Sequence, residues 1–150
     1  MDELLQILTG MLGTIGFSLL FHVQGKKFLP IALGGALSWA VYLLVVHFGY
    51  SSSLAILAAT TAVGLLAEVY ARTLKAPAIL FLVPMLVPLI PGSALYYTTR
   101  YLVLQDSALF AKYGNTLLTE AGAIAFGIIL VACFVHLPLR IWKGEKRGKR

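Results

Sequence analysis

The sequence contains few charged residues and a single cysteine. Charged side chains make up 12% of the 150 residues, about half of the share in ordinary soluble domains. Because Cys133 is the one cysteine in the sequence, a disulfide within the chain is excluded. It lies in an apolar run, and we interpret it as a packing residue. The three histidines are far apart and lack the spacing of metal-binding pairs. These absences exclude a soluble catalytic domain, and we expect no enzyme activity, no cofactor and no metal site.

The sequence contains instead a series of long apolar runs. Apolar residues make up 59% of the chain, and its mean hydropathy is +0.88. Because about 20 apolar residues cross the hydrocarbon core of a bilayer, the sequence predicts an all-α integral membrane protein of about five transmembrane helices. Residues 106–114 are expected to be a short interfacial connector. The predicted single transmembrane domain is residues 1–138, with spans near 4–22, 29–48, 53–71, 77–104 and 115–138 and a basic tail over 139–150.

Basic residues are distributed unevenly over the predicted loops. Ten of the twelve lysines and arginines fall on one side of the membrane, and only Arg100 and Lys112 fall on the other. The positive-inside rule therefore predicts an N-terminus outside and a C-terminus in the cytoplasm. The net charge of +6 and the basic tail are better explained by this orientation and by contact with anionic lipid than by nucleic-acid binding.

The fourth predicted span carries three internal prolines, Pro84, Pro88 and Pro91, and the last is followed by Gly92. Proline has no N–H and crowds the carbonyl four residues earlier, so we expect free carbonyls along one face of this span. Inside a bilayer, such backbone is tolerated only against protein or beside a water-filled cavity. The sequence predicts a spanning helix that is broken within residues 84–92. A re-entrant loop is the alternative, although it would place the basic tail outside.

A broken span is a candidate site for a transported solute. Helix N-termini bind anions, and secondary transporters hold solutes and ions on the ends of discontinuous helices. In this segment Ser93 offers a hydroxyl, Tyr96 could orient or gate a ligand, and Arg100 could attract an anion. The alternatives are a packing kink, interfacial tyrosines and an arginine that marks the interface. The candidate translocation residues are Pro84, Pro88, Pro91, Gly92, Ser93, Tyr96 and Arg100.

Two acidic residues within the spans are further candidates. An unpaired carboxylate in a bilayer costs several kcal/mol by most scales, roughly 2.5–3.5 at the helix centre. Glu68 is therefore either a proton-coupling residue or the partner of Arg72 in an i, i+4 ion pair. Glu120 is expected near the start of the fifth span, where the helix macrodipole favours a carboxylate whatever the protein does. Functional and structural roles stay open for both acids.

Small residues form faces on the first two spans. Gly10, Gly13 and Gly16 lie on the first span, and Gly34 and Gly35 lie on the second. Such faces let helices approach closely, within one chain or between subunits. They predict tight packing or the docking of a partner.

Two motifs stand around the third and fourth spans. The first consists of Glu68, Ala71, Arg72, Lys75 and Pro77, and the second of Pro84, Pro88, Pro91, Gly92 and Tyr96. Together they resemble the bacterial threonine/serine exporter family. Gly16–Phe17, Lys26–Lys27 and the stretch from Gly34 to Trp39 are also similar to the second, smaller half of that family. The resemblance covers about residues 10–104, and the last span matches only in character.

The resemblance implies a proton-coupled exporter in the bacterial cytoplasmic (inner) membrane. It implies threonine and serine as solutes or, in members split into two proteins, dicarboxylates such as succinate. This chain is similar to the smaller protein of the split form, which implies a second, larger membrane subunit as its partner. On the residues alone, two other classes stay open: a homo-oligomeric channel or facilitator, and a membrane scaffold that transports nothing.

Overall fold

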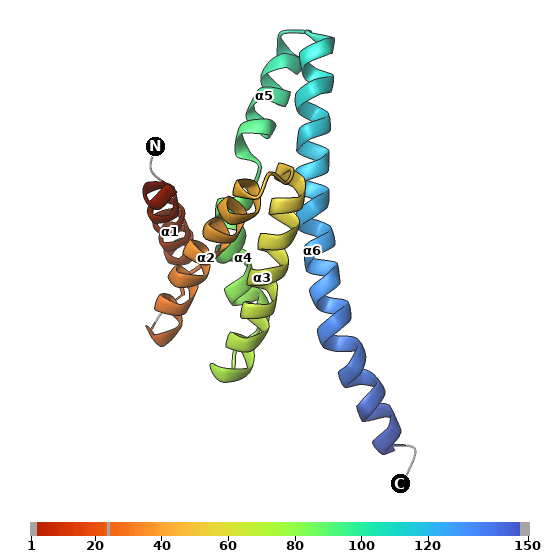
Figure 1. Cartoon of the computed structure of the whole chain (residues 1–150). Helices are drawn as coiled ribbons and strands as arrows, with labels where there is room; N and C mark the ends of the chain where they lie inside the picture. Colours follow the sequence, from red (N-terminus) through yellow and green to blue (C-terminus); the bar gives the residue numbers. More distant parts are fainter. Residues whose placement is uncertain (1–2, 24, 148–150) are drawn as a thin grey trace.

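Helices make up nearly all of the described chain in the computed structural model (Figure 1). The structure describes residues 3–23 and 25–147, with side chains as far as Val135, and contains no strand among them. The predicted all-α class is confirmed. The elements are α1 (Glu3–Leu20), the 3-10 helix η1 (Gly25–Lys27), α2 (Phe28–His47), α3 (Ser52–Thr73), α4 (Ala78–Leu86), the 3-10 helix η2 (Val87–Leu89), α5 (Gly92–Val103) and α6 (Ser107–Arg147).

Four of these segments, α1, α2 with η1, α3 and α6, are each long and apolar enough to cross a bilayer. The α4–η2 segment and α5 meet the same criterion only as a pair, and they are bent by 62° at the break between them. Counting this pair as one span gives the five spans that the sequence predicts. Because the bend is smaller than a right angle, α5 continues away from α4 (Figure 1), whereas the second arm of a re-entrant loop would return beside it.

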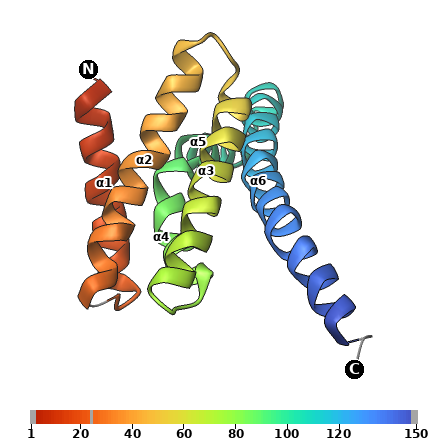
Figure 2. The same ribbon diagram turned by 60° about the horizontal axis from the view of Figure 1, so that its bottom comes forward.

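The α1–α4 bundle holds the core of the molecule. Helix α2 packs between α1 and α3, and α4 packs on both α2 and α3 (Figure 2). Phe81 and Met85 of α4 are fully buried there against Val63 of α3 and its neighbours. Many leucines and phenylalanines on the outer faces are exposed, as expected where lipid tails replace water as the solvent.

Small residues allow the helices of this bundle to approach closely. A Cβ atom on Gly34 would lie 2.5 Å from Met85 Sδ, and one on Gly35 would overlap the Thr14 side chain. A Cβ atom on Gly13 or Gly16 would have no described atom of another helix within 4 Å. The glycines of α2 therefore pack within the chain, whereas these two glycines of α1 face outward.

Helix α5 packs on the first part of α6, and the hairpin that they form extends beyond the α1–α4 bundle (Figure 1), whereas α6 packs on α3 farther along its length. Stacked tyrosine rings join α5 and α6, with Tyr113 centred 4.9 Å from Tyr97 and 5.5 Å from Tyr101. Asp106 Oδ1 accepts the N–H of Leu109 at 3.0 Å, which is the bond of an N-cap. The expected separate connector over 106–114 is therefore wrong. Those residues are the cap and the first turns of α6, which begins at 107 and not at 115.

The basic turns lie together at one end of the molecule. The α1–α2 turn, the α3–α4 turn and the C-terminal end of α6 lie at one end, and the α5–α6 turn lies at the other (Figures 1 and 2). The first two turns carry Lys26, Lys27 and Lys75. The loops that the charge pattern assigns to one side of the membrane are thus on one side of the fold.

Candidate functional site

The break in the fourth span is a 3-10 turn followed by an extended residue. After η2, Ile90 adopts φ −63° and ψ 126°, and α5 then begins. The carbonyl of Pro84 accepts the N–H of Val87, and the carbonyl of Val87 accepts the N–H of Ile90 at 3.3 Å. These are the carbonyls that Pro88 and Pro91 were expected to leave free. That expectation is wrong because the chain tightens into 3-10 geometry and supplies other donors.

The first turn of α5 uses its backbone in a similar way. The N–H of Gly92 donates to the carbonyl of Ile90 at 2.7 Å, and the N–H of Leu95 donates to the carbonyl of Pro91 at 3.0 Å. A Cβ atom on Gly92 would have no described neighbour within 4 Å. The space beside Gly92 is therefore open, although its own N–H is already bonded.

A pocket of about 130 Å³ lies beside this break, where α2, α3 and α6 meet the end of α4 and the start of α5. We call it the break pocket. It unites Pro88, Pro91, Ser93 and Glu120, which the sequence analysis proposed separately. Its lining residues are Trp39, Tyr42, Ser52, Ile56, Pro88, Leu89, Ile90, Pro91, Ser93 and Glu120.

A chain of side-chain contacts runs through the break pocket. Ser52 Oγ donates to Glu120 Oε1 at 2.9 Å, and the Tyr42 hydroxyl lies 3.2 Å from Ser52 Oγ. Because a serine hydroxyl has one proton, Tyr42 donates to Ser52. The Tyr42 ring stacks on Trp39 at 4.8 Å, and Trp39 Nε1 donates to Gln6 Oε1 at 3.3 Å. Side chains of α1, α2, α3 and α6 are linked in this way.

The position of Glu120 within α6 changes its interpretation. Because α6 begins at Ser107, Glu120 lies about three and a half turns from the helix start. The macrodipole acts within the first turn, so the expected structural reason for this carboxylate is wrong. Glu120 is half-buried and, among the described residues, forms no ion pair.

Trp39, Tyr42 and Ser52 are the aromatic and polar pocket residues that the sequence analysis did not propose for the site. Trp39 and Tyr42 are three residues apart in α2, so their aromatic side chains share one face of the helix. Ser52 follows the N-cap Ser51. Serines are common at helix starts, so Ser52 did not stand out as a site residue. The sequence contained these signals, but only the packing of α6 on α3 brings them to Glu120.

Four predicted translocation residues are not in the lining of the break pocket. Gly92 lies in the chain between the lining residues Pro91 and Ser93, and its own atoms do not line the pocket. Pro84 is fully buried within the α1–α4 bundle. Tyr96 is 60% exposed and makes an edge contact with Tyr97. Arg100 is exposed, with its guanidinium 5.9 Å from the centre of the Tyr101 ring. The pocket therefore contains the break and the start of α5 but not the outer part of α5.

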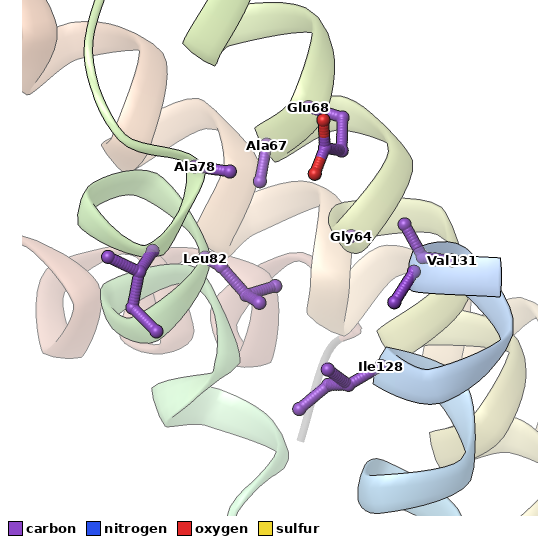
Figure 3. A pocket seen from close by; sticks show the side chains of 9 residues that line it. Gly64, Ala67, Glu68, Ala78, Leu82, Ile128 and Val131 are labelled. Carbon is purple, nitrogen blue, oxygen red and sulfur yellow. The ribbon is translucent and has the colours of Figure 1, made fainter. Parts of the chain in front are cut away.

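Glu68 lies in a second pocket, of about 200 Å³, between α3, α4 and α6. We call it the Glu68 pocket. Figure 3 shows the carboxylate between Ala78 and Leu82 on one side and Ile128 and Val131 on the other. Glu68 supplies the one charged side chain among the residues that line this pocket.

Glu68 also forms an ion pair with Arg72 of the same helix. Arg72 Nη2 donates to Glu68 Oε2 at 3.2 Å, and the side chains are 53% and 14% exposed, respectively. The ion pair that the i, i+4 spacing predicts is therefore present. The same side chain also lines the apolar Glu68 pocket. Glu68 therefore remains in contact with this pocket while it is paired with Arg72.

Helix α3 connects the two pockets along its contact with α6. Ser52 lines the break pocket and Glu68 lines the other, and Thr60 is eight residues from each. Thr60 is fully buried, and its hydroxyl has no hydrogen-bond partner in the described part of the chain. A Cβ atom on Gly127 would lie 2.7 Å from Thr60 Cγ2, so α3 and α6 are in close contact here.

Comparison with known protein families agrees with this architecture. The family model described as Threonine/Serine exporter, ThrE, matches residues 6–134. This chain belongs to the threonine/serine exporter family. It is thus a multi-pass membrane exporter of the threonine/serine type, in a family of transporters and not of enzymes. The matched region includes every residue that lines either pocket. No solved structure matches the chain.

In this threonine/serine exporter, the break pocket offers the groups that a small polar solute requires. Hydroxyls come from Ser52 and Ser93, aromatic surface comes from Trp39 and Tyr42, and a negative charge comes from Glu120. Its volume of about 130 Å³ is below the roughly 300–1,000 Å³ of pockets for drug-sized ligands. The pocket suits a solute of few atoms.

Proposed function

We propose that the break pocket forms part of the solute site of a proton-coupled exporter that works with a second, larger membrane subunit. The observation that carries this proposal is the meeting of the interrupted fourth span with Ser52, Ser93 and Glu120 in one pocket. Broken spans in secondary transporters place their solute sites where the helix is interrupted. On this basis the site accepts small carboxylate-bearing solutes such as threonine, serine or succinate.

The start of α5 supplies the positive end of this site. A helix N-terminus attracts negative groups because its first N–H groups and its macrodipole are directed toward them. Ser93, in the first turn of α5, lines the break pocket and adds a hydroxyl donor. We assign the solute carboxylate to this end of the pocket.

We assign proton coupling to Glu68. Its carboxylate lies in an otherwise apolar pocket and is paired with a half-exposed arginine of its own helix. Protonation removes the cost of the charge when the pair separates. In this scheme Arg72 holds the ionised form, and a proton replaces Arg72 during the transport cycle.

Two outward surfaces support a partner subunit. Gly13 and Gly16 of α1 have open space around them, and small residues are typical of faces on which membrane helices associate. Helix α5 packs mainly on α6 and leaves its other side uncovered. We propose that the larger subunit covers one or both surfaces.

Transport by reconstituted liposomes tests the proposal. The chain is reconstituted alone or with its larger subunit, and the flux of labelled threonine, serine and succinate is measured with and without a proton gradient. We expect flux only with both chains and only with the gradient. Gradient-independent flux through this chain alone would identify a channel or facilitator and contradict the proposal.

A matched pair of variants tests the location of the site. Ser93→Leu places an apolar side chain on the wall of the break pocket and should abolish export. Thr116→Leu makes a similar change at an exposed position of α6 that lines neither pocket and should retain export. Equal flux through both variants would remove the break pocket from the transport path and leave the scaffold interpretation.

A further inference from the structure

We infer that Glu120 binds the ammonium group of the solute, so that the break pocket prefers zwitterionic amino acids to dicarboxylates. This inference rests on the proposed function of the break pocket as the solute site. It goes beyond that proposal by assigning a specificity-determining residue and by choosing between the two solute classes.

The charge distribution in the pocket favours a cationic group. Glu120 is the one charged side chain among the residues that line the break pocket. Within the part of the chain that the structure describes, it has no basic partner within ion-pair distance. A carboxylate inside a membrane protein is costly unless it is paired. A solute ammonium supplies the pairing that the chain itself does not.

One oxygen of the carboxylate is held by the protein, and the other is available. Glu120 Oε1 accepts a hydrogen bond from Ser52, which in turn accepts one from Tyr42. No hydrogen bond to Oε2 is found among the described residues, and Oε2 is not one of their buried polar atoms without a partner. This oxygen is therefore accessible, and the Tyr42–Ser52 chain restrains the group that carries it.

The surroundings of Glu120 strengthen an ion pair with a bound solute. Trp39, Ile56 and the prolines of the break line the same pocket with carbon atoms. Charges attract more strongly beside such low-dielectric walls than in water. The rings of Trp39 and Tyr42 also present π-electron surface, which favours a nearby cation.

The two charged groups of an amino acid match the two ends of the pocket. The ammonium lies at Glu120 on α6, and the carboxylate lies at Ser93 and the start of α5, both of which line the pocket. Succinate has a second carboxylate in place of the ammonium. That group would face Glu120, and like charges in contact oppose binding. The expected preference is for threonine and serine.

The first test is the substitution of Glu120 in reconstituted exporter with its partner subunit. We expect Glu120→Gln to weaken the apparent affinity for threonine about tenfold or more, because a charge-assisted hydrogen bond is lost. Succinate transport should be unchanged or increased, so the selectivity ratio falls. Glu120→Asp keeps the charge and should keep the preference.

Glu68→Gln is the matched control, since it makes the same amide-for-carboxylate change in the other pocket. It should lower the transport of threonine and succinate by the same factor and leave their ratio unchanged. If Glu120→Gln also lowers both solutes equally, Glu120 has a coupling or structural role, and the inference is overturned.

The second test changes the solute and leaves the protein intact. 3-Hydroxybutyrate has the carbon skeleton, hydroxyl and carboxylate of threonine but lacks the ammonium. It should compete with labelled threonine at least about tenfold more weakly than unlabelled threonine does. Equal competition would overturn the inference even if the Glu120 variants failed to insert.

The outcomes separate the inference from the function on which it rests. If Ser93→Leu blocks threonine export while Glu120→Gln keeps the wild-type selectivity, the solute site stands and the role of Glu120 is wrong. If Ser93→Leu exports at the wild-type rate, the break pocket is not the solute site and both proposals fail.

Discussion

The two intramembrane carboxylates, Glu68 and Glu120, differ in what holds them. Glu68 is paired with Arg72 one turn along its own helix, whereas Glu120 is held by Ser52 of a different helix. A spacing of four residues in one helix can be recognised in a sequence. A bond across 68 residues requires the packed fold. This difference explains why the Glu68–Arg72 pair was predicted and the Tyr42–Ser52–Glu120 chain was not.

The Glu68–Arg72 pair should contribute little to stability. Because Arg72 is 53% exposed, Arg72→Gln should lower the free energy of unfolding by only about 0.3–0.5 kcal/mol. Unfolding by SDS in mixed micelles measures this change. Lys75→Gln is the matched control, since no ion pair of Lys75 is found in the described chain. A loss above about 2 kcal/mol would exceed what an exposed i, i+4 pair supplies.

The glycines of α1 and α2 should respond differently to an added methyl group. Gly35→Ala forces a Cβ atom into the Thr14 side chain, and such overpacking costs about 1–3 kcal/mol. Gly16→Ala adds the same atom in open space and should leave the stability of the isolated chain nearly unchanged. The same SDS titration compares them. Equal stability of the two variants would contradict the close α1–α2 contact.

At the scale of elements, the fourth span shows how a proline-rich helix can be broken without leaving its carbonyls free. The 3-10 turn η2 provides donors for Pro84 and Val87, and the 62° bend follows at Ile90 and Pro91. The sequence predicted the position of this break but not its hydrogen bonds. The bend opens a pocket because α5 leaves α4 and follows α6.

Restoring the missing donors should straighten the span. With Pro88→Ala and Pro91→Ala combined, α4 can continue into α5 as one helix, because the two N–H groups and the freedom of φ return. Spin labels at Ile79 and Val103, which are both exposed, should then be farther apart in pulsed EPR measurements, and export should be lost. Pro77→Ala, at the cap of α4, is the control. An unchanged distance would show that packing on α6, and not proline, causes the bend.

At the scale of the whole molecule, the basic turns lie at one end and the α5–α6 turn lies at the other (Figure 1). The positive-inside rule predicts that the basic end faces the cytoplasm. Cysteine labelling tests this orientation, after exposed Cys133 is replaced by serine. In intact cells a membrane-impermeant reagent should modify Tyr50→Cys and Gln105→Cys, whereas Lys75→Cys should react only after permeabilisation. Labelling of Lys75→Cys in intact cells would show that the topology is the opposite of the predicted one.

The exposure of Cys133 also shows where sequence interpretation is weakest. Cys133 lies in an apolar run and was interpreted as a packing residue, yet it is exposed on the surface of α6. In a soluble protein an apolar residue indicates the core, but in a membrane protein lipid accepts apolar side chains equally well. Hydrophobicity therefore marks the spans without distinguishing their buried faces from their lipid-facing ones.

The predicted start of the last span, at 115, was an error that the local sequence could have prevented. Asp106 precedes the helix and caps it through the N–H of Leu109, and an aspartate before an apolar run is a recognised start signal. The segment 106–114 was assigned to a connector because it mixes charged residues with Leu109, Phe110 and Tyr113. That assignment placed Glu120 at a helix start and concealed its deep position in α6.

The sequence by itself determined the membrane class and the location of the break. It also placed the ends of the first four spans to within a few residues. These features depend on local properties, namely the length of apolar runs and the missing N–H of proline. Only the tertiary structure decided that the break meets Trp39, Tyr42, Ser52 and Glu120 in one pocket. The physical reason is that helix contacts are set by shape, through glycines such as Gly35 and Gly127 that admit neighbouring side chains. In lipid, hydrophobicity alone does not select which faces meet.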